Sequence, residues 1–395
     1  MKVNPDAAGF DAARLERITE HLTTRYIEPG KVAGCQVAVS RHGEVGYFRS
    51  LGTMELGGST PVRDDTIWRI YSMTKPITGV ALMTLYERGA FALNDPVHRY
   101  IPQWRDLKVR DGEAQVDPQQ PMTVRDLLMH MSGLGYTAPG DNRPLRPLGD
   151  TTATLETLVD RLAEQPLHFH PGTRWLYGVS TDICGRLVEI LSGKRFDAYL
   201  QDEVFGPLGM VDTAFMVPDE KIDRFPPNYR RTSDKTLEQI DDPKTSTYRK
   251  PRSFLSGGGG LVSTAHDYVR FAQMLVNGGE LDGVRVLGRK TVELMSMNHL
   301  PGSGELREFA IPGAYGETGF DGVGFGLTLA VGLGPVAMQT IGCAGEFYWG
   351  GAASTIFWID PVEDLTVVFM TQLMPSGTFN FRGQLKTVVY PAIVD

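Results

Sequence analysis

The stretches of this chain that are richest in β-forming residues lie near its two ends, and a mostly helical stretch separates them. Near the start, residues 32–40 and 45–48 flank a polar turn and predict a β-hairpin. Later strands are predicted at residues 327–332, 339–343, 354–359 and 365–372. These strands do not alternate with helices, as the strands of a parallel sheet do. We therefore expect an α+β sandwich in which both ends of the chain form one central antiparallel sheet flanked by helices.

Helical periodicity marks the segments that should cover this sheet or lie beside it. Residues 8–27 and 72–89 have apolar residues at helical spacing, and Gly89 is placed to end the second of these helices. Thr264 has the side chain of a helix N-cap and precedes a helical pattern that extends to Asn277. Further helices are predicted at residues 123–131, 151–164, 180–192, 197–205 and 381–393.

The middle of the chain consists of short helical stretches joined by loops rich in proline and glycine. We predict that residues 1–89 together with 251–395 form a sheet domain, and that residues 90–250 form a mostly helical region inserted between its two halves. The active site is expected at the junction, because ligand pockets form preferentially between structural units.

The charge pattern narrows the classes of partner. The 395 residues have a net charge of −8 with both signs interspersed, and no basic stripe could follow a phosphate backbone. No apolar run reaches the roughly 18 residues of a membrane span, and the first residues lack the apolar core of a signal peptide. We expect a cytoplasmic protein that binds neither nucleic acid nor membrane. The sequence pattern does not specify an oligomeric state.

The cysteines and histidines do not indicate a metal site. Cys35, Cys184 and Cys343 are widely spaced and form no CxxC pair. The eight histidines form no HExxH motif or other tight ligand cluster. We expect buried thiols, no metal and no cofactor.

The first candidate for chemistry is the tetrapeptide that runs from Ser72 to Lys75. A serine hydroxyl is a weak nucleophile that needs a base beside it, and residues three apart on a helix share a face. Lys75 can therefore reach Ser72, whose place at a helix N-terminus also favours a developing oxyanion. Short motifs of this kind occur by chance. The alternative is an N-cap serine followed by a solvated lysine.

Two further segments carry residues that could join this pair. Tyr177 lies between a turn and a helical run, where a phenol beside a lysine could relay a proton. The alternative is a tyrosine that only packs against the sheet. Gly350 and Gly351 would let the backbone approach a ligand after a strand, and a backbone N–H there could complete an oxyanion hole. The alternative is a β-bulge without a chemical role.

Other residues are interpreted as structural. His130 is expected to be a hydrogen-bonding structural histidine, although a histidine base is the alternative. Asp182 is expected to anchor its own helix. The chain contains no Gly-x-Ser-x-Gly, so the nucleophile elbow of the α/β-hydrolases is absent.

Together these segments resemble the serine β-lactamase and penicillin-binding protein superfamily, whose motif is Ser-x-x-Lys. The sequence is most similar to the family VIII carboxylesterases, which share the class C β-lactamase fold. The resemblance covers nearly the whole chain and includes residues 72–75, 127–134 (LLMHMSGL), 169–173 (FHPGT), 177–185, 256–264 and 349–351 (WGG).

The resemblance implies a role for each matching residue. Ser72 would be the nucleophile, with Lys75 and Tyr177 as the acid–base pair. The N–H groups of Ser72 and Ala352 would form the oxyanion hole. Trp349, Gly350 and Gly351 would line the substrate pocket.

Two departures from the class C pattern favour small-molecule esters over β-lactams as substrates. Val179 replaces the Asn of the Tyr-x-Asn motif, and Trp349 replaces the Lys of Lys-Thr-Gly. An indole cannot hold a substrate carboxylate as an ammonium does, but it offers apolar area to an acyl or alcohol group. We therefore expect a carboxylesterase for short-chain esters. The alternatives are a β-lactamase, a D-amino-acid amidase or peptidase, or an acyltransferase on the same fold, and a non-hydrolytic penicillin-binding protein.

Overall fold

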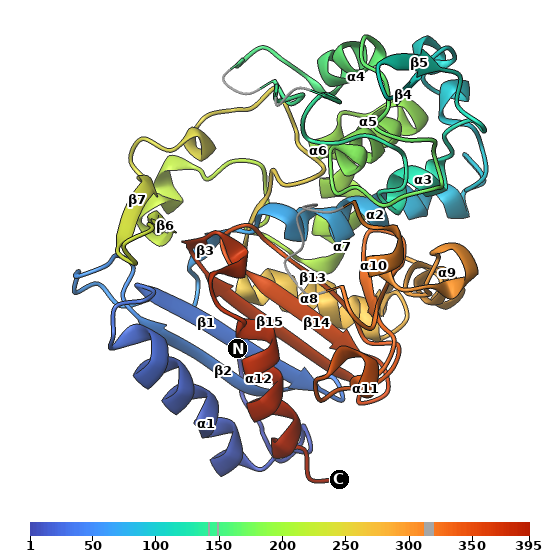
Figure 1. Cartoon of the computed structure of the whole chain (residues 1–395). Coiled ribbons are helices and arrows are strands. Elements are labelled where there is room, and N and C mark those ends of the chain that lie inside the picture. The colour runs from blue at the N-terminus through green and yellow to red at the C-terminus, as the bar shows by residue number, and fades with distance from the viewer. Residues whose placement is uncertain (141–142, 148–149, 312–319) are drawn as a thin grey trace.

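A seven-stranded antiparallel sheet forms the centre of the protein, seen in a computed structural model that describes residues 1–140, 143–147, 150–311 and 320–395. The strand order is β11-β12-β13-β14-β15-β1-β2. Strands β13, β14, β15, β1 and β2 are labelled in Figure 1. The strands are β1 (Gly34–Arg41), β2 (Glu44–Gly52), β11 (Val323–Phe325), β12 (Ala330–Gly332), β13 (Phe347–Gly350), β14 (Ile356–Asp360) and β15 (Leu365–Thr371).

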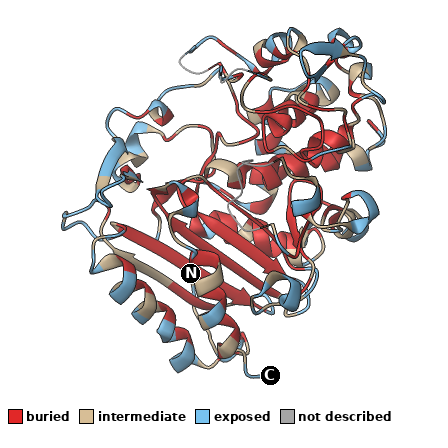
Figure 2. Cartoon of the chain, in the orientation of Figure 1, coloured by how far each residue is buried: buried red, intermediate tan, exposed pale blue. Residues whose placement is uncertain are grey.

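Strand β1 joins the two ends of the chain within this sheet. On one side it pairs with β2, its hairpin partner, and on the other with β15, in the register that sets Val39 opposite Val367. Every residue of β1 is buried, because helices cover both faces of the sheet (Figure 2). The predicted fold class, a β-lactamase-like α+β sandwich, is confirmed.

Helices from both ends of the chain cover one face of the sheet. Helix α1 (Ala12–Leu22) contacts β2 and also α12 (Phe381–Val389), and the two helices lie side by side over the sheet (Figure 1). Helix α8 (Ala265–Val276) covers the opposite face and contacts β1, β14 and β15. Its N-cap is Thr264, as predicted, whose side chain accepts a hydrogen bond from the backbone N–H of Asp267 at 3.1 Å.

The remaining helices lie mainly beside the sheet (Figure 1). They are α2 (Thr74–Glu87), α3 (Val124–Leu128), α4 (Leu155–Ala163), α5 (Ser180–Ser192), α6 (Phe196–Leu200), α7 (Gly206–Leu208), α9 (Arg289–Met295), α10 (Leu306–Phe309) and α11 (Pro335–Met338). Helix α5 packs against α2, α3 and α4. Helix α2 is buried on all sides from Thr74 to Leu85, so its first turn is held by packing rather than by a single apolar face. The division into two domains remains a prediction.

The structure corrects the prediction of a strand at residues 339–343. Pro335 begins the short helix α11, and the following turn contains Gly342 and Gly345 with positive φ angles, which a strand does not accommodate. The strand of this part of the chain begins after this turn and is β13. Trp349 and Gly350 are therefore inside a strand, and Gly351 follows its end.

Several short strands lie outside the predicted set. They are β3 (Ile67–Arg69), β4 (Val109–Asp111), β5 (Ala114–Val116), β6 (Asn228–Arg231), β7 (Leu237–Asp241), β8 (Val262–Thr264), β9 (Glu280–Leu281), β10 (Val284–Arg285) and β16 (Leu373–Met374). The β6–β7 hairpin is largely polar and partly exposed, so it lacks the apolar alternation that marks a strand in sequence. None of the helices in the described ranges combines the length and the apolar character needed to cross a bilayer.

Candidate active site

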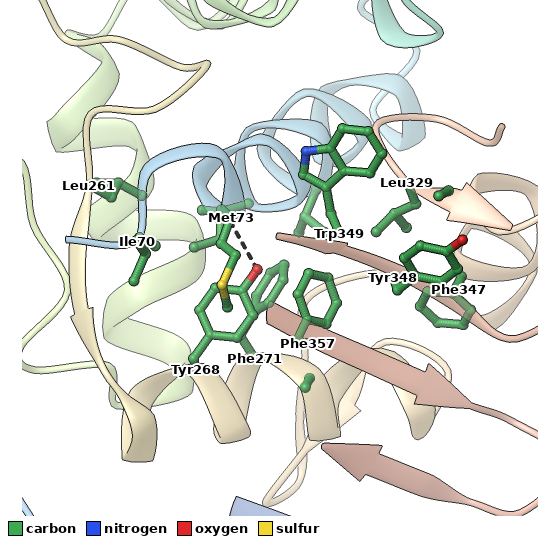
Figure 3. Close-up of a cluster of buried hydrophobic side chains, with 14 of the residues drawn as sticks. Ile70, Met73, Leu261, Tyr268, Phe271, Leu329, Phe347, Tyr348, Trp349 and Phe357 are labelled. Atoms are coloured by element: carbon green, nitrogen blue, oxygen red, sulfur yellow. Dashed lines mark hydrogen bonds between the residues drawn. The ribbon is translucent and has the colours of Figure 1, made fainter. Parts of the chain in front are cut away.

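Ser72 lies in a short 3₁₀ turn, Tyr71–Met73, that leads directly into helix α2. The side chain of Met73 is fully buried in an apolar cluster, and its carbonyl accepts a hydrogen bond from the Tyr268 hydroxyl at 2.9 Å (Figure 3). Tyr71 has a φ of 41°, an unfavourable region for a residue with a large side chain. The Asn228 amide donates to the Tyr71 hydroxyl at 2.9 Å. These contacts hold the partly exposed Ser72 at the end of a rigid helix.

Lys75 meets Ser72 as the Ser-x-x-Lys spacing predicted. Its Nζ lies 3.2 Å from Ser72 Oγ, 3.3 Å from the Tyr136 hydroxyl and 2.7 Å from the carbonyl oxygen of Gly258. The side chain is fully buried, which excludes the alternative of a solvated lysine. The three contacts direct the amine at the serine oxygen.

Burial also changes the acid–base properties of Lys75. Removal from water lowers the pKa of its ammonium well below 10.5, and the positive charge of Arg146 lowers it further, while Asp182 acts in the opposite direction. A lysine with a lowered pKa holds a lone pair at a pH where an exposed lysine would not. The amine can then act as a base toward Ser72.

Tyr177 is enclosed by aromatic rings on the other side of Lys75. The Lys75 Nζ lies 4.4 Å from the centre of the Tyr177 ring. Trp175 stacks on this ring with centroids 5.9 Å apart, and Tyr136 meets it edge-on at 5.6 Å. The indole N–H of Trp349 donates to the Tyr177 hydroxyl oxygen at 3.2 Å. The structure therefore brings Ser72, Lys75, Tyr177 and Trp349 together, while their catalytic roles remain predictions.

His130 also packs against Tyr177, with ring centroids 4.9 Å apart. The histidine is fully buried, and its ring nitrogens meet the backbone N–H of Gly178 at 3.4 Å and the Thr181 hydroxyl at 3.3 Å. Burial, reinforced by the charge of Lys75, lowers its pKa well below 6.5. A neutral histidine in these contacts fits the structural interpretation made from the sequence.

Strand β13 brings the third predicted segment to the serine. Trp349 is only 4% exposed, and its carbonyl accepts a hydrogen bond from the Arg382 guanidinium at 2.9 Å. A Cβ added to Gly351 would lie 2.4 Å from the carbonyl oxygen of Ile70, so only glycine allows the end of β13 to approach the serine turn this closely. The next residue, Ala352, remains the predicted second oxyanion donor.

Three residues at this site were not predicted from the sequence. The hydroxyl of Tyr136 lies close to Lys75. Tyr136 comes two residues after the matching segment 127–134, and this proximity was a weak signal. Arg146 lies in a polar loop and carries no motif. Gly258 contributes only a backbone carbonyl to Lys75, which sequence patterns do not reveal.

Asp182 anchors its helix, as expected, through contacts with other segments of the chain. Its buried carboxylate accepts hydrogen bonds from Arg146 at 2.7 Å, from the Ser256 hydroxyl at 2.5 Å and from the Gly258 N–H at 3.0 Å. Asp182 thus connects helix α5 to the loop that binds Lys75.

The fold and the Ser72–Lys75 pair place the protein in the serine β-lactamase and penicillin-binding protein superfamily that its sequence resembles. The beta-lactamase family matches residues 19–388 of the chain, and the chain belongs to that family.

Similar proteins include two bacterial relatives and one solved structure. Protein Rv1367c of Mycobacterium tuberculosis is 32% identical over 363 residues, which cover 88% of each chain. Esterase EstB of Burkholderia gladioli is 29% identical over 396 residues, 95% of each chain. The structure of EstCE1, described as a hydrolase with promiscuous acyltransferase activity, matches with a TM-score of 0.81 and 26% identity over 96% of this chain and 99% of that one.

Proposed function

We propose that this protein is a serine carboxylesterase that cleaves short-chain esters of small molecules through an acyl-enzyme on Ser72. The observation that carries this proposal is the 3.2 Å contact between Ser72 Oγ and the amine of the fully buried Lys75. Similarity to esterase EstB supports the substrate class. We also propose that the protein acts in the cytoplasm, as expected from the sequence.

Acylation begins when neutral Lys75 accepts the hydroxyl proton of Ser72 and the serine oxygen attacks the ester carbonyl carbon. The backbone N–H groups of Ser72 and Ala352 stabilise the oxyanion of the tetrahedral intermediate. The bond to the alcohol oxygen then breaks, and Tyr177 gives its proton to the departing alcohol. The proton taken up by Lys75 returns to Tyr177, directly or through the Tyr136 hydroxyl.

Deacylation repeats the same steps with water. The Lys75 and Tyr177 pair removes a proton from water, whose oxygen attacks the acyl carbon, and the proton returns to Ser72 Oγ as the acid leaves. The scheme requires only side chains and backbone groups of this chain.

The substrate class can be tested with a panel of p-nitrophenyl esters of increasing acyl length beside the β-lactam nitrocefin. We expect kcat/KM to be highest for short acyl chains and far lower for nitrocefin, because buried Trp349 supplies no cation for a lactam carboxylate. Efficient nitrocefin hydrolysis with weak ester hydrolysis would overturn the esterase assignment in favour of a β-lactamase.

Acyl transfer to an alcohol is a second candidate activity, supported by similarity to EstCE1, a hydrolase with promiscuous acyltransferase activity. The same acyl-enzyme serves both reactions, since only the acceptor differs. Adding a primary alcohol to the ester assay distinguishes them. A new ester among the products indicates transfer, whereas free acid alone indicates hydrolysis.

Trp349→Phe tests whether the indole does more than line a pocket. The variant keeps an aromatic ring but removes the N–H that donates to the Tyr177 oxygen. Loss of one such bond is worth about 1–1.5 kcal/mol, so we expect kcat to fall about tenfold with little change in KM.

Trp358→Phe is a matched control for this variant. Trp358 lies on the neighbouring strand β14, is equally buried, and its indole nitrogen has no hydrogen-bond partner among the described residues. Equal kcat values for the two variants would show that the Trp349 N–H has no role.

A further inference from the structure

The loop of residues 256–260 lies between helices α2 and α5 and touches both. The Gly258 carbonyl accepts the hydrogen bond from Lys75 at 2.7 Å, and the Gly257 carbonyl accepts one from the Thr78 hydroxyl, also at 2.7 Å. A Cβ on Gly257 would lie 2.6 Å from the Thr181 carbonyl oxygen. The loop therefore fits its place only with glycine, and its position sets the position of the lysine amine.

The carboxylate of Asp182 fixes this loop from the side of helix α5. One oxygen accepts the hydrogen bonds from Ser256 and from the Gly258 N–H, and the other accepts both bonds from the Arg146 guanidinium, at 2.7 and 3.1 Å. The Asp182 side chain is completely buried. A buried carboxylate with all its partners in place is costly to disturb, so this arrangement is rigid.

We propose that Arg146 and Asp182 are positioning residues of the esterase reaction, which hold the Gly258 carbonyl and through it direct Lys75 Nζ at Ser72 Oγ. This inference rests on the proposed function. Arg146 and Asp182 act on the lysine through the loop and through their charges, and neither needs to touch the substrate.

The charges around Lys75 give this proposal a distinctive readout. Arg146 lowers the pKa of Lys75 and Asp182 raises it. Two further titratable neighbours, His130 and Tyr136, stay uncharged at neutral pH, because burial lowers the pKa of His130 and raises that of Tyr136. The Tyr177 ring also lies beside the amine, with its centre 4.4 Å from Lys75 Nζ. Arg146 and Asp182 are thus the opposing charges whose balance acts on the amine.

Removing the charge of Asp182 and removing the charge of Arg146 should shift the pH dependence of activity in opposite directions. The acid limb of kcat/KM reports the pKa of the base in the free enzyme. Asp182→Asn leaves Arg146 unbalanced, which favours the neutral amine and moves the acid limb to lower pH. Arg146→Gln leaves Asp182 unbalanced, which favours the ammonium and moves the limb to higher pH. We expect shifts of about one pH unit and a fall of about 10–100-fold in maximal kcat/KM.

Ser256→Ala separates positioning from charge. It removes one hydrogen bond from the Asp182 carboxylate without changing any charge. We expect a lower kcat with an unmoved acid limb. Arg186→Gln is the matched control and should change neither quantity, because Arg186 pairs with Glu156 of helix α4 and with Glu189 of helix α5, and neither pair involves Asp182 or the 256–260 loop.

The experiment measures p-nitrophenyl butyrate hydrolysis from about pH 5 to about pH 10 for the wild type and these variants, with circular dichroism to check folding. Opposite limb shifts together with the Ser256→Ala result support the proposal. Limbs that stay in place, or move the same way in both charge variants, overturn it. If Asp182→Asn does not fold, a limb that moves to higher pH in Arg146→Gln, beside an unmoved limb and lower kcat in Ser256→Ala, supports the proposal, and any other result overturns it. Wild-type hydrolysis that does not depend on Ser72 would instead refute the proposed function.

Discussion

Ser72→Ala is expected to lower kcat/KM for p-nitrophenyl butyrate by about 10³- to 10⁶-fold, since it removes the atom that forms the acyl-enzyme. The remaining rate would reflect binding and the backbone donors alone. Because Ser72 is partly exposed and the turn that holds it depends on Met73 and Tyr268, the variant should fold with unchanged thermal stability.

Three controls sharpen this test. Ser233→Ala removes a hydroxyl from an exposed loop and should leave the rate unchanged. EDTA should not affect the wild type, because the scheme uses no metal. A serine-reactive phosphonate should add its mass to the peptide that contains Ser72. Labelling of another peptide, or full activity of the Ser72→Ala variant, would show that the nucleophile is a different residue.

Lys75→Met should remove the base while keeping a side chain of similar length in the buried site. We expect kcat to fall about 10²- to 10⁴-fold, the usual contribution of a general base. Lys244→Met, on an exposed loop, is the control for the loss of a lysine. Retained activity in Lys75→Met would mean that Ser72 is activated by another group.

The same variant also has an expected effect on stability. Burial lowers the pKa of Lys75 in the folded protein below its value in the unfolded chain. Between these two pKa values the unfolded chain binds more protons, so the free energy of unfolding rises as the pH increases through this window. Lys75→Met should be at least as stable as the wild type at about pH 7. Urea unfolding at several pH values should show no such rise in its free energy of unfolding. The same pH dependence as in the wild type would contradict this prediction.

Strongly patterned segments of the fold could be predicted from the sequence. Helix α5 has the predicted bounds, and Thr264 caps α8 as expected, because a polar cap next to an apolar period is a local signal. The β6–β7 hairpin could not be predicted, since tertiary pairing with β16 forms it rather than an apolar pattern of its own.

The site was predictable where its geometry is local and unpredictable where it is not. The contact between Ser72 and Lys75 follows from helical spacing within one turn. The contacts of Lys75 with Tyr136 and with the Gly258 carbonyl join segments far apart in sequence, and the second uses a backbone atom that any residue would supply. Trp349 was predicted as apolar surface, but the direction of its indole N–H toward Tyr177 depends on how β13 packs.

The place of β1 between β2 and β15 also has a consequence for synthesis on the ribosome. The β1–β2 hairpin can form as soon as both strands have left the ribosome. The other edge of β1 is paired only later, when β15 is available and Leu365 lies opposite Arg41. Until then the nascent chain exposes an apolar strand edge of the kind that recruits other chains. The central sheet can therefore close only after β15 has been synthesised, however early the β1–β2 hairpin forms.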